Sequence, residues 1–144
     1  MEGAMKAATL LFLRITTGML LVIWGTNKLL KSGLGTKLSE TYYNGLFSAE
    51  ALQLPLAAGE IALGVLVVLG ALRIITYPIQ AIVLGFGAVM LWQHMLDPLS
   101  LYLWEDGSKA NLLFFPSSTV FAASLVLLAF KEHDALSLDA MFKR

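Results

Sequence analysis

Two oppositely charged residues, Arg14 and Glu60, each interrupt a long apolar segment of this 144-residue chain. A charge in an apolar environment is unfavourable unless an opposite charge or a set of hydrogen bonds compensates it. A guanidinium and a carboxylate on facing helices can form an ion pair, and a buried carboxyl can also exchange a proton with a bound molecule. We therefore interpret Arg14 and Glu60 as a structural ion pair, with a substrate or proton site at Glu60 as the alternative.

Other polar residues of the apolar segments are expected to lie near Glu60. Arg14, Gly18, Gly25 and Lys28 share one helical stripe, because their spacing keeps them on one face at ~100° per residue. Glycines on such a stripe let a neighbouring helix approach closely in lipid. With a rise of ~1.5 Å per residue, the polar residues that reach the outer half of the bundle are Lys28, Glu60, His94, Asn111, Ser117 and Ser118.

These residue types suit the binding of a quinone head group. A quinone carbonyl needs hydrogen-bond donors and a proton source as it gains charge, so Glu60 and His94 are the candidate catalytic residues. The candidate quinone-binding residues, which include two indole rings for stacking, are Lys28, Trp24, Trp92, Asn111, Ser117 and Ser118. A structural interpretation stays open, because lysines can snorkel, tryptophans can anchor the bilayer interface and serines can bond to their own helix.

Neither a haem nor a metal site is expected. Bis-histidine haem ligation across helices needs two histidines within the membrane, whereas His133 follows the last apolar segment and leaves only His94. One histidine and one glutamate are too few ligands for a zinc site. The chain has no cysteine, which excludes disulfides and thiolate ligands.

The elements that position these residues follow from the composition. Hydrophobic residues make up 58% of the chain and charged residues 14%, which is unlike a typical soluble domain. Runs of ~20 apolar residues can cross ~30 Å of hydrocarbon as helices. The sequence predicts one all-α membrane domain over residues 1–144, an antiparallel four-helix bundle with spans at about 7–29, 52–71, 74–96 and 112–130. The first span is expected to be permanent and not a secretory signal, since Arg14 interrupts it and no A-x-A-like cleavage site follows.

The connections limit the topology. Leu72 and Arg73 alone separate the second span from the third, which predicts an antiparallel hairpin. The longer first connection carries Leu38, Tyr42 and Leu46 at helical spacing, which predicts a short interfacial helix. An even number of spans places both termini on one side of the membrane. The basic residues favour the cytoplasm for that side, with Lys6, Arg73, Lys131, Lys143 and Arg144 there against Lys28, Lys31, Lys37 and Lys109 opposite.

Several stretches form an ordered pattern along nearly the whole chain. They are L-L-F-L-R-I-T-T-G-M-L-L-V-I-W-G-T-N-K-L at 10–29, G-E-I-A-L-G-V-L-V-V-L-G-A-L-R at 59–73, a histidine at position 94 and S-L-D-A at 137–140. This pattern resembles the DoxX/DoxD family of small four-helix membrane proteins. One departure is Trp24, which stands where a typical member often has a histidine.

The resemblance implies a four-helix membrane fold in a bacterial or archaeal plasma membrane. For some members it also implies thiosulfate or thiol oxidation coupled to quinone reduction, while other members are membrane partners of redox enzymes. The expected function is therefore a subunit of a quinone-linked membrane redox system, with quinone as the candidate cofactor. The alternative is a non-catalytic structural or assembly subunit of a larger membrane complex.

The expected partners follow from the same reading. The lipid bilayer is the first of them, and a larger membrane or peripheral redox subunit or a second copy of the chain are further candidates. Nucleic acid is not expected. A transporter or channel fits less well, because four helices leave little lumen and no inverted repeat is evident.

Overall fold

The chain is helical throughout the part that the structure describes. The structure is a computed structural model, and it describes residues 2–31, 33–103, 114 and 116–142. Within these ranges it contains helices and no strand, which confirms the all-α class. In chain order the elements are α1 (Glu2–Leu30), α2 (Leu34–Tyr42), α3 (Glu50–Leu69), α4 (Arg73–Met90), α5 (Trp92–Leu96), α6 (Pro116–Ala129), the 3-10 turn η2 (Lys131–His133) and α7 (Leu138–Phe142).

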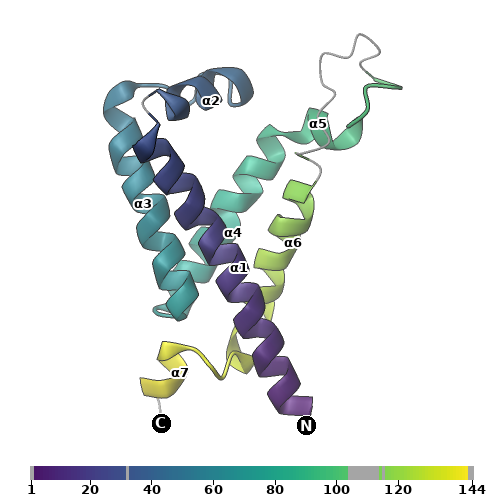
Figure 1. The fold of residues 1–144 in the computed structure, drawn as a ribbon. Coiled ribbons are helices and arrows are strands. Elements are labelled where there is room, and N and C mark those ends of the chain that lie inside the picture. The colour runs from purple at the N-terminus through teal and green to yellow at the C-terminus, as the bar shows by residue number, and fades with distance from the viewer. Residues whose placement is uncertain (1, 32, 104–113, 115, 143–144) are drawn as a thin grey trace.

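Three of the described helices, α1, α3 and α4, are long and apolar enough to cross a membrane. They pack antiparallel, as the alternation of their directions in Figure 1 shows. The fourth apolar helix, α6, has 14 residues, which is shorter than a bilayer-spanning helix requires. The predicted fourth span includes residues 112, 113 and 115, which lie outside the described residues.

A seam of glycines brings the second half of α1 into close contact with α3 (Figure 1). A Cβ atom added at Gly18 would lie 2.8 Å from the carbonyl oxygen of Gly64, and one added at Gly64 would lie 2.6 Å from that of Gly18. About two turns further along α1, a Cβ at Gly25 would lie 2.7 Å from the carbonyl oxygen of Ala57. No side chain fits at these positions, so the predicted glycine stripe is the helix interface.

The predicted hairpin between α3 and α4 is present, although the two helices stay close only near their turn. Gly70 ends α3 in the left-handed conformation at φ 68°, and the amide of Ala71 donates to the carbonyl of Leu66, as in a glycine-capped helix end. Beyond the turn, α4 diverges from α3 and packs mainly against α6 (Figure 1). The molecule is therefore built from two helix pairs, α1 with α3 and α4 with α6.

The two ends of the molecule differ. We call the end that carries α2 and α5 the outer end, and the end that carries α7 and the start of α1 the inner end (Figure 1). The expected short helix after the first span is α2, although Leu46 lies beyond its last residue. The expected third span is shorter than 74–96, because the helix ends at Met90 and Leu91 leaves helical geometry at φ −95° and ψ 12°.

Candidate functional site

Lys28 and Glu60 form an ion pair between α1 and α3 in the outer half of the molecule. The Lys28 Nζ lies 2.5 Å from Glu60 Oε1, and the two side chains are only 18% and 20% exposed. The glycine seam sets this contact, because the close approach of the antiparallel helices places their side chains at the same level. The second carboxylate oxygen, Glu60 Oε2, is buried and has no hydrogen-bond partner among the described residues.

Aromatic rings bridge the outer ends of the two helix pairs above this ion pair. We call Tyr42, Tyr43, Phe86, His94 and Phe114 the outer ring cluster. The His94 ring lies 5.8 Å from that of Tyr42 and 5.2 Å from that of Phe114, and Tyr42 and Phe114 meet edge to face at 4.8 Å. The Tyr43 ring lies 6.0 Å from that of Phe86. These contacts join the end of α2 and the residue after it to α4, to α5 and to Phe114, which precedes α6.

Tyr43 links the ring cluster to the ion pair. Burial raises the pKa of its hydroxyl above the ordinary value, and the negative charge of Glu60 raises it further. Tyr43 is therefore a neutral hydroxyl at physiological pH, within the electrostatic reach of Glu60. The sequence-based site did not include Tyr42, Tyr43 or Phe86; two adjacent tyrosines at the end of a predicted interfacial helix were the available signal.

The structure brings together some of the predicted quinone-binding residues and separates others. Lys28 and Glu60 form one ion pair, and His94 lies in the outer ring cluster. Trp24 and Trp92 are 42% and 47% exposed, so both indoles lie largely on the surface of the chain. Ser117 is partly buried and Ser118 is exposed on the first turn of α6, whereas Asn111 lies outside the described residues.

The expected ion pair between Arg14 and Glu60 is replaced by two separate pairs. Arg14 Nη1 lies 2.9 Å from Asp134 Oδ2, at the opposite end of the molecule from Lys28 and Glu60. Asp134 is 120 positions away in the chain and follows α6, so the apolar periodicity of the spans holds no signal for it. The charges pair this way because each cation has a carboxylate at its own depth.

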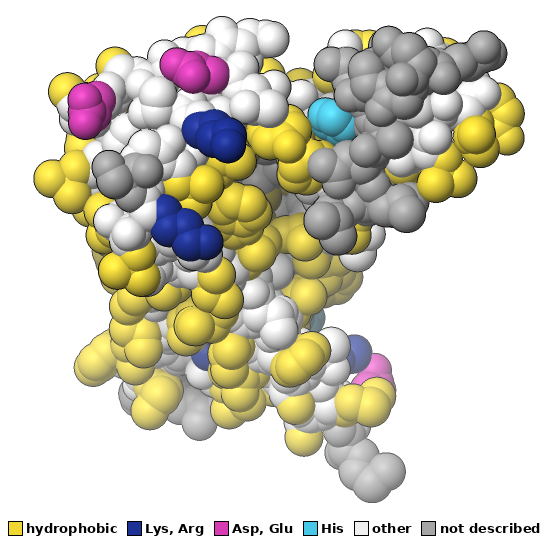
Figure 2. Space-filling view, turned by 45° about the horizontal axis from the view of Figure 1, so that its top comes forward, with side chains coloured by type: hydrophobic (Ala, Val, Ile, Leu, Met, Phe, Trp, Pro, Cys, Tyr) yellow, Lys and Arg dark blue, Asp and Glu magenta, His cyan; other side chains and the backbone are white. Residues whose placement is uncertain are grey.

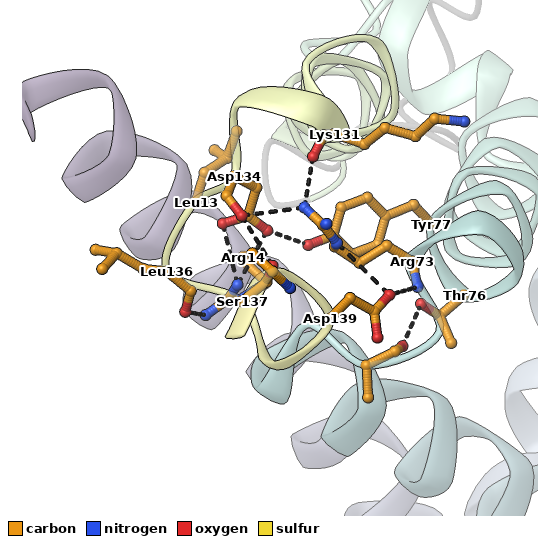
Figure 3. Close-up of polar contacts among 12 residues, drawn as sticks. Leu13, Arg14, Arg73, Thr76, Tyr77, Lys131, Asp134, Leu136, Ser137 and Asp139 are labelled. Atoms are coloured by element: carbon orange, nitrogen blue, oxygen red, sulfur yellow. Dashed lines mark hydrogen bonds and ion pairs between the residues drawn. The ribbon is translucent and has the colours of Figure 1, made fainter. Parts of the chain in front are cut away.

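Asp134 is the centre of a buried network at the inner end (Figure 3). The side chains of Arg14 and Asp134 are 3% and 0% exposed. The Tyr77 hydroxyl donates to Asp134 Oδ2 at 2.5 Å, and Arg14 Nη2 donates to the carbonyl oxygen of Leu136 at 3.1 Å. The Asp134 carboxylate is thus held by groups from α1 and α4 at once, which fixes the segment after α6 against the bundle.

Arg73 and Asp139 extend this network to the start of α4 (Figure 3). Arg73 Nη1 donates to the carbonyl oxygens of Lys131 at 2.6 Å and Asp134 at 3.0 Å. The Asp139 carboxylate accepts from the backbone amides of Leu72 at 2.9 Å and Arg73 at 2.8 Å. Since Leu72 supplies no side-chain cap of its own, Asp139 caps α4 from another part of the chain.

The geometry of the inner network does not suggest a role in ligand binding. Its charges are balanced, and both oxygens of each carboxylate accept from donors of the same chain, while Arg14 Nε and Arg73 Nε are buried without a hydrogen-bond partner among the described residues. Gly70 is part of it, because a Cβ there would lie 2.5 Å from Arg14 Nη1 and 2.5 Å from the Cβ of Ser137. The inner network therefore joins the two helix pairs, and the outer pair of Lys28 and Glu60 is the candidate functional site.

Comparison of the chain with protein-family models, with curated proteins and with solved structures found no match. Three helices long and apolar enough to cross a bilayer are typical of a small helical membrane protein, and their apolar surfaces are suited to contact with lipid. What the protein does must therefore be inferred from Lys28, Glu60 and the outer ring cluster.

Proposed function

We propose that this chain is a DoxX-like integral membrane protein that binds a quinone head group between Lys28, Glu60 and the outer ring cluster, as a subunit of a quinone-linked redox system. The observation that carries the proposal is the second carboxylate oxygen of Glu60, which is buried without a hydrogen-bond donor in the described part of the chain. A buried acceptor without a partner is unfavourable, and a bound donor removes that penalty.

The pair of Lys28 and Glu60 offers the two kinds of group that the two forms of a quinone need. The oxidised form presents carbonyl oxygens, which accept from an ammonium group such as that of Lys28. The reduced form presents hydroxyls, which donate to a carboxylate oxygen such as Glu60 Oε2. Electrons come from a partner redox subunit, while Glu60 and His94 exchange the protons that the reduction takes up.

The outer ring cluster supplies the apolar part of the proposed site. Offset or edge-to-face packing of aromatic rings adds to the burial of apolar surface, and a quinone ring can take part in the same packing. His94 lies between Tyr42 and Phe114, so it combines a ring contact with a titratable nitrogen. This arrangement supports the partly buried Tyr42 and Tyr43 as the stacking residues in place of the exposed Trp24 and Trp92.

The proposal includes a fourth span, formed by α6 and the residues before it, and an orientation with both termini in the cytoplasm. The start of α1 and the position of α7 at one end of the molecule support an even number of spans (Figure 1). The basic residues near the span ends support the orientation. A prokaryotic plasma membrane is the location that the resemblance to the DoxX/DoxD family implies.

Quinone binding to the purified protein tests the proposal. A soluble short-chain ubiquinone or menaquinone analogue should bind to the detergent-solubilised protein, and the affinity should fall at least about tenfold in Glu60→Gln, as expected for loss of a buried charged hydrogen-bond partner. His94→Ala should weaken binding as well. Glu132→Gln, an exposed carboxylate at the inner end, is the matched control and should bind like the parent protein. Binding that is absent, or equal in Glu60→Gln and Glu132→Gln, contradicts the proposal.

The alternative is a structural or assembly subunit without a ligand of its own. The inner network favours it in one respect, since Arg14, the deepest charge of α1, serves only to hold the chain together. Purification in mild detergent at native expression levels separates the two proposals. A stoichiometric larger partner without bound quinone supports the assembly subunit, whereas quinone retained by the isolated chain supports the redox subunit.

A further inference from the structure

A cavity of about 530 Å³ opens at the outer end of the molecule. It lies where α1 ends and where α2 and the first turns of α3 begin. Figure 2 turns this end toward the viewer and shows basic and acidic side chains close together on its surface. The polar side chains of its wall are Lys28, Thr36, Lys37, Glu40, Glu50 and Gln53. A cavity of this size with charged walls and an open mouth holds water.

Specific contacts among α2, α3 and the segment between them build the wall of this cavity. Gln53 Nε2 donates to the carbonyl oxygen of Phe47 at 2.5 Å, and Thr36 Oγ1 donates to that of Ser48 at 3.2 Å. Gly35 packs directly against the Gln53 amide, leaving no room for a Cβ. The cavity therefore follows from the docking of α2 on α3 and not from a loose surface loop.

Lys28 is the connection between the cavity and the buried carboxyl. Its side chain lines the cavity, and its Nζ contacts Glu60 Oε1 at 2.5 Å. Glu60 is not among the residues that line the cavity, and its Oε2 is buried. The charged groups that face Lys28 are thus Glu60 on the buried side and Lys37, Glu40 and Glu50 on the water-filled side.

We infer that the cavity is the aqueous entrance through which Glu60 exchanges protons, and that Lys28 carries the proton from the cavity to the buried carboxyl. The ammonium group of Lys28 passes a proton from Nζ to Glu60 Oε1, and a hydronium ion in the cavity returns a proton to the neutral amine. The net change converts a hydronium ion and a carboxylate into water and a carboxylic acid. This inference rests on the proposed function and deepens it, because it assigns the source of the protons that quinone reduction consumes.

Zero-length crosslinking with a water-soluble carbodiimide tests the entrance without any quinone. The reagent activates the Glu60 carboxyl, the Lys28 amine displaces the resulting urea, and an amide joins the two side chains. The pair of Lys6 and Glu2, 2.6 Å apart and exposed at the inner end, is an internal control in the same molecule. The protein is reconstituted in lipid vesicles that are made permeable, so that the reagent reaches both faces of the membrane. Both crosslinks are then measured by peptide mass spectrometry.

A reversible plug tells access through the cavity from access through the lipid. The chain has no cysteine, so Leu54→Cys places a single thiol on the cavity wall. Modification of that thiol with a bulky, charged, disulfide-forming reagent should slow the crosslink between Lys28 and Glu60 several-fold, and reduction should restore its rate. The crosslink between Lys6 and Glu2 should not change.

The outcomes also distinguish this inference from the proposed function. An unchanged rate of the Lys28–Glu60 crosslink after modification of Leu54→Cys overturns the entrance, even if quinone binds. Absence of that crosslink while the Lys6–Glu2 crosslink forms overturns it too. A plugged and slowed crosslink in a protein that binds no quinone leaves the entrance in place and overturns only the quinone site.

Discussion

At the scale of single residues, the chain separates its buried charges into two ion pairs with different surroundings. Asp134 at the inner end accepts from Arg14 and Tyr77 and has no exposed surface on its side chain. Glu60 at the outer end is bound by Lys28 through one oxygen, and its other oxygen is buried without a donor in the described residues. The Asp134 carboxylate accepts hydrogen bonds at both oxygens, whereas Glu60 keeps one oxygen without a donor, so the first arrangement suits stability and the second suits ligand or proton exchange.

Removing the charge of Asp134 should be strongly destabilising. Asp134→Asn leaves Arg14 as a buried and unpaired cation, and we expect it to lower the free energy of unfolding by about 3–5 kcal/mol. Thermal or denaturant unfolding in detergent measures this loss. Glu2→Gln breaks an exposed pair of neighbouring helical turns and should cause no measurable change.

A double replacement checks that the loss arises from the unpaired charge. Arg14→Met combined with Asp134→Leu removes both charges and should recover most of the stability that Asp134→Asn loses. Equal stability of Asp134→Asn and Glu2→Gln would show that the inner ion pair contributes nothing.

At the scale of elements, two devices determine how the helices meet. The glycine seam sets the distance between α1 and α3, since backbone atoms of one helix lie where a side chain of the other would begin. Asp139 caps α4 from a segment that is 66 positions away, at the point where the amides of a helix start lack partners. The segment after α6 therefore acts on helices that precede it in the chain.

The glycine seam predicts opposite effects for two glycines of α3. Gly64→Ala should destabilise the protein by about 1–3 kcal/mol, because its Cβ meets the Gly18 carbonyl and forces the helices apart. Gly59→Ala meets nothing within 4 Å and should be neutral or stabilising by up to about 1 kcal/mol from helix propensity. The two variants are compared by unfolding in the same detergent. A Gly64→Ala variant as stable as Gly59→Ala would refute the close contact.

The cap on α4 predicts an acid-dependent part of the stability. Burial raises the pKa of Asp139, whereas hydrogen bonds from the amides of Arg73 and Leu72 and the charge of Arg73 lower it. The lowering effects are larger together, so the folded-state pKa lies below its ordinary value of 3.8. The contribution of the carboxylate is therefore complete above pH 3.8 and is lost as the pH falls through the lower folded-state value.

Two replacements separate the cap from its charge. Asp139→Ala should lower stability by about 0.5–2 kcal/mol at neutral pH, because the amides of α4 lose their acceptor. Asp139→Asn keeps an acceptor and should retain most of the stability at neutral pH, but the decrease below pH 3.8 should be smaller than in the parent protein. Melting temperatures between acidic and neutral pH measure both effects, and parallel curves for the parent and Asp139→Asn would exclude the proposed linkage.

At the scale of the whole molecule, two helix pairs are joined differently at their two ends. The inner network ties them together through buried charges, whereas aromatic rings bridge them at the outer end. Charge-assisted hydrogen bonds with several donors hold one geometry, whereas aromatic rings can change their packing at a small cost in free energy. The outer end is therefore the part of the molecule where we propose that a ring-shaped ligand binds.

The even number of proposed spans can be tested directly with introduced cysteines. In membrane vesicles of defined orientation, Gly3→Cys and Phe142→Cys should react with a membrane-impermeant thiol reagent from the same side. Ala49→Cys, in the connection between α2 and α3, should react from the opposite side. The cysteine-free parent chain provides the background. Labelling of Gly3→Cys and Phe142→Cys from opposite sides would rule out a fourth span.

Features that depend on neighbouring residues along the chain could be predicted well. The helical class, the short helix after the first span, the turn at Leu72 and the glycine stripe through Gly18 and Gly25 all follow from local hydropathy and spacing. The end of α4 at Met90 could not be predicted, because the apolar run continues past Leu91 and holds no glycine or proline that would end the helix there.

The sequence by itself determined that the chain is helical, with helices apolar enough to cross a membrane and charges within them, because hydropathy and helical periodicity are properties of each segment alone. Only the tertiary structure decided which charges pair. Arg14 pairs with Asp134 and Glu60 with Lys28, because the segment after α6 folds back to the inner end and the glycine seam sets the level of α1 against α3. A pairing across 120 positions depends on the depth of each side chain in the assembled bundle, and local sequence patterns do not predict that depth.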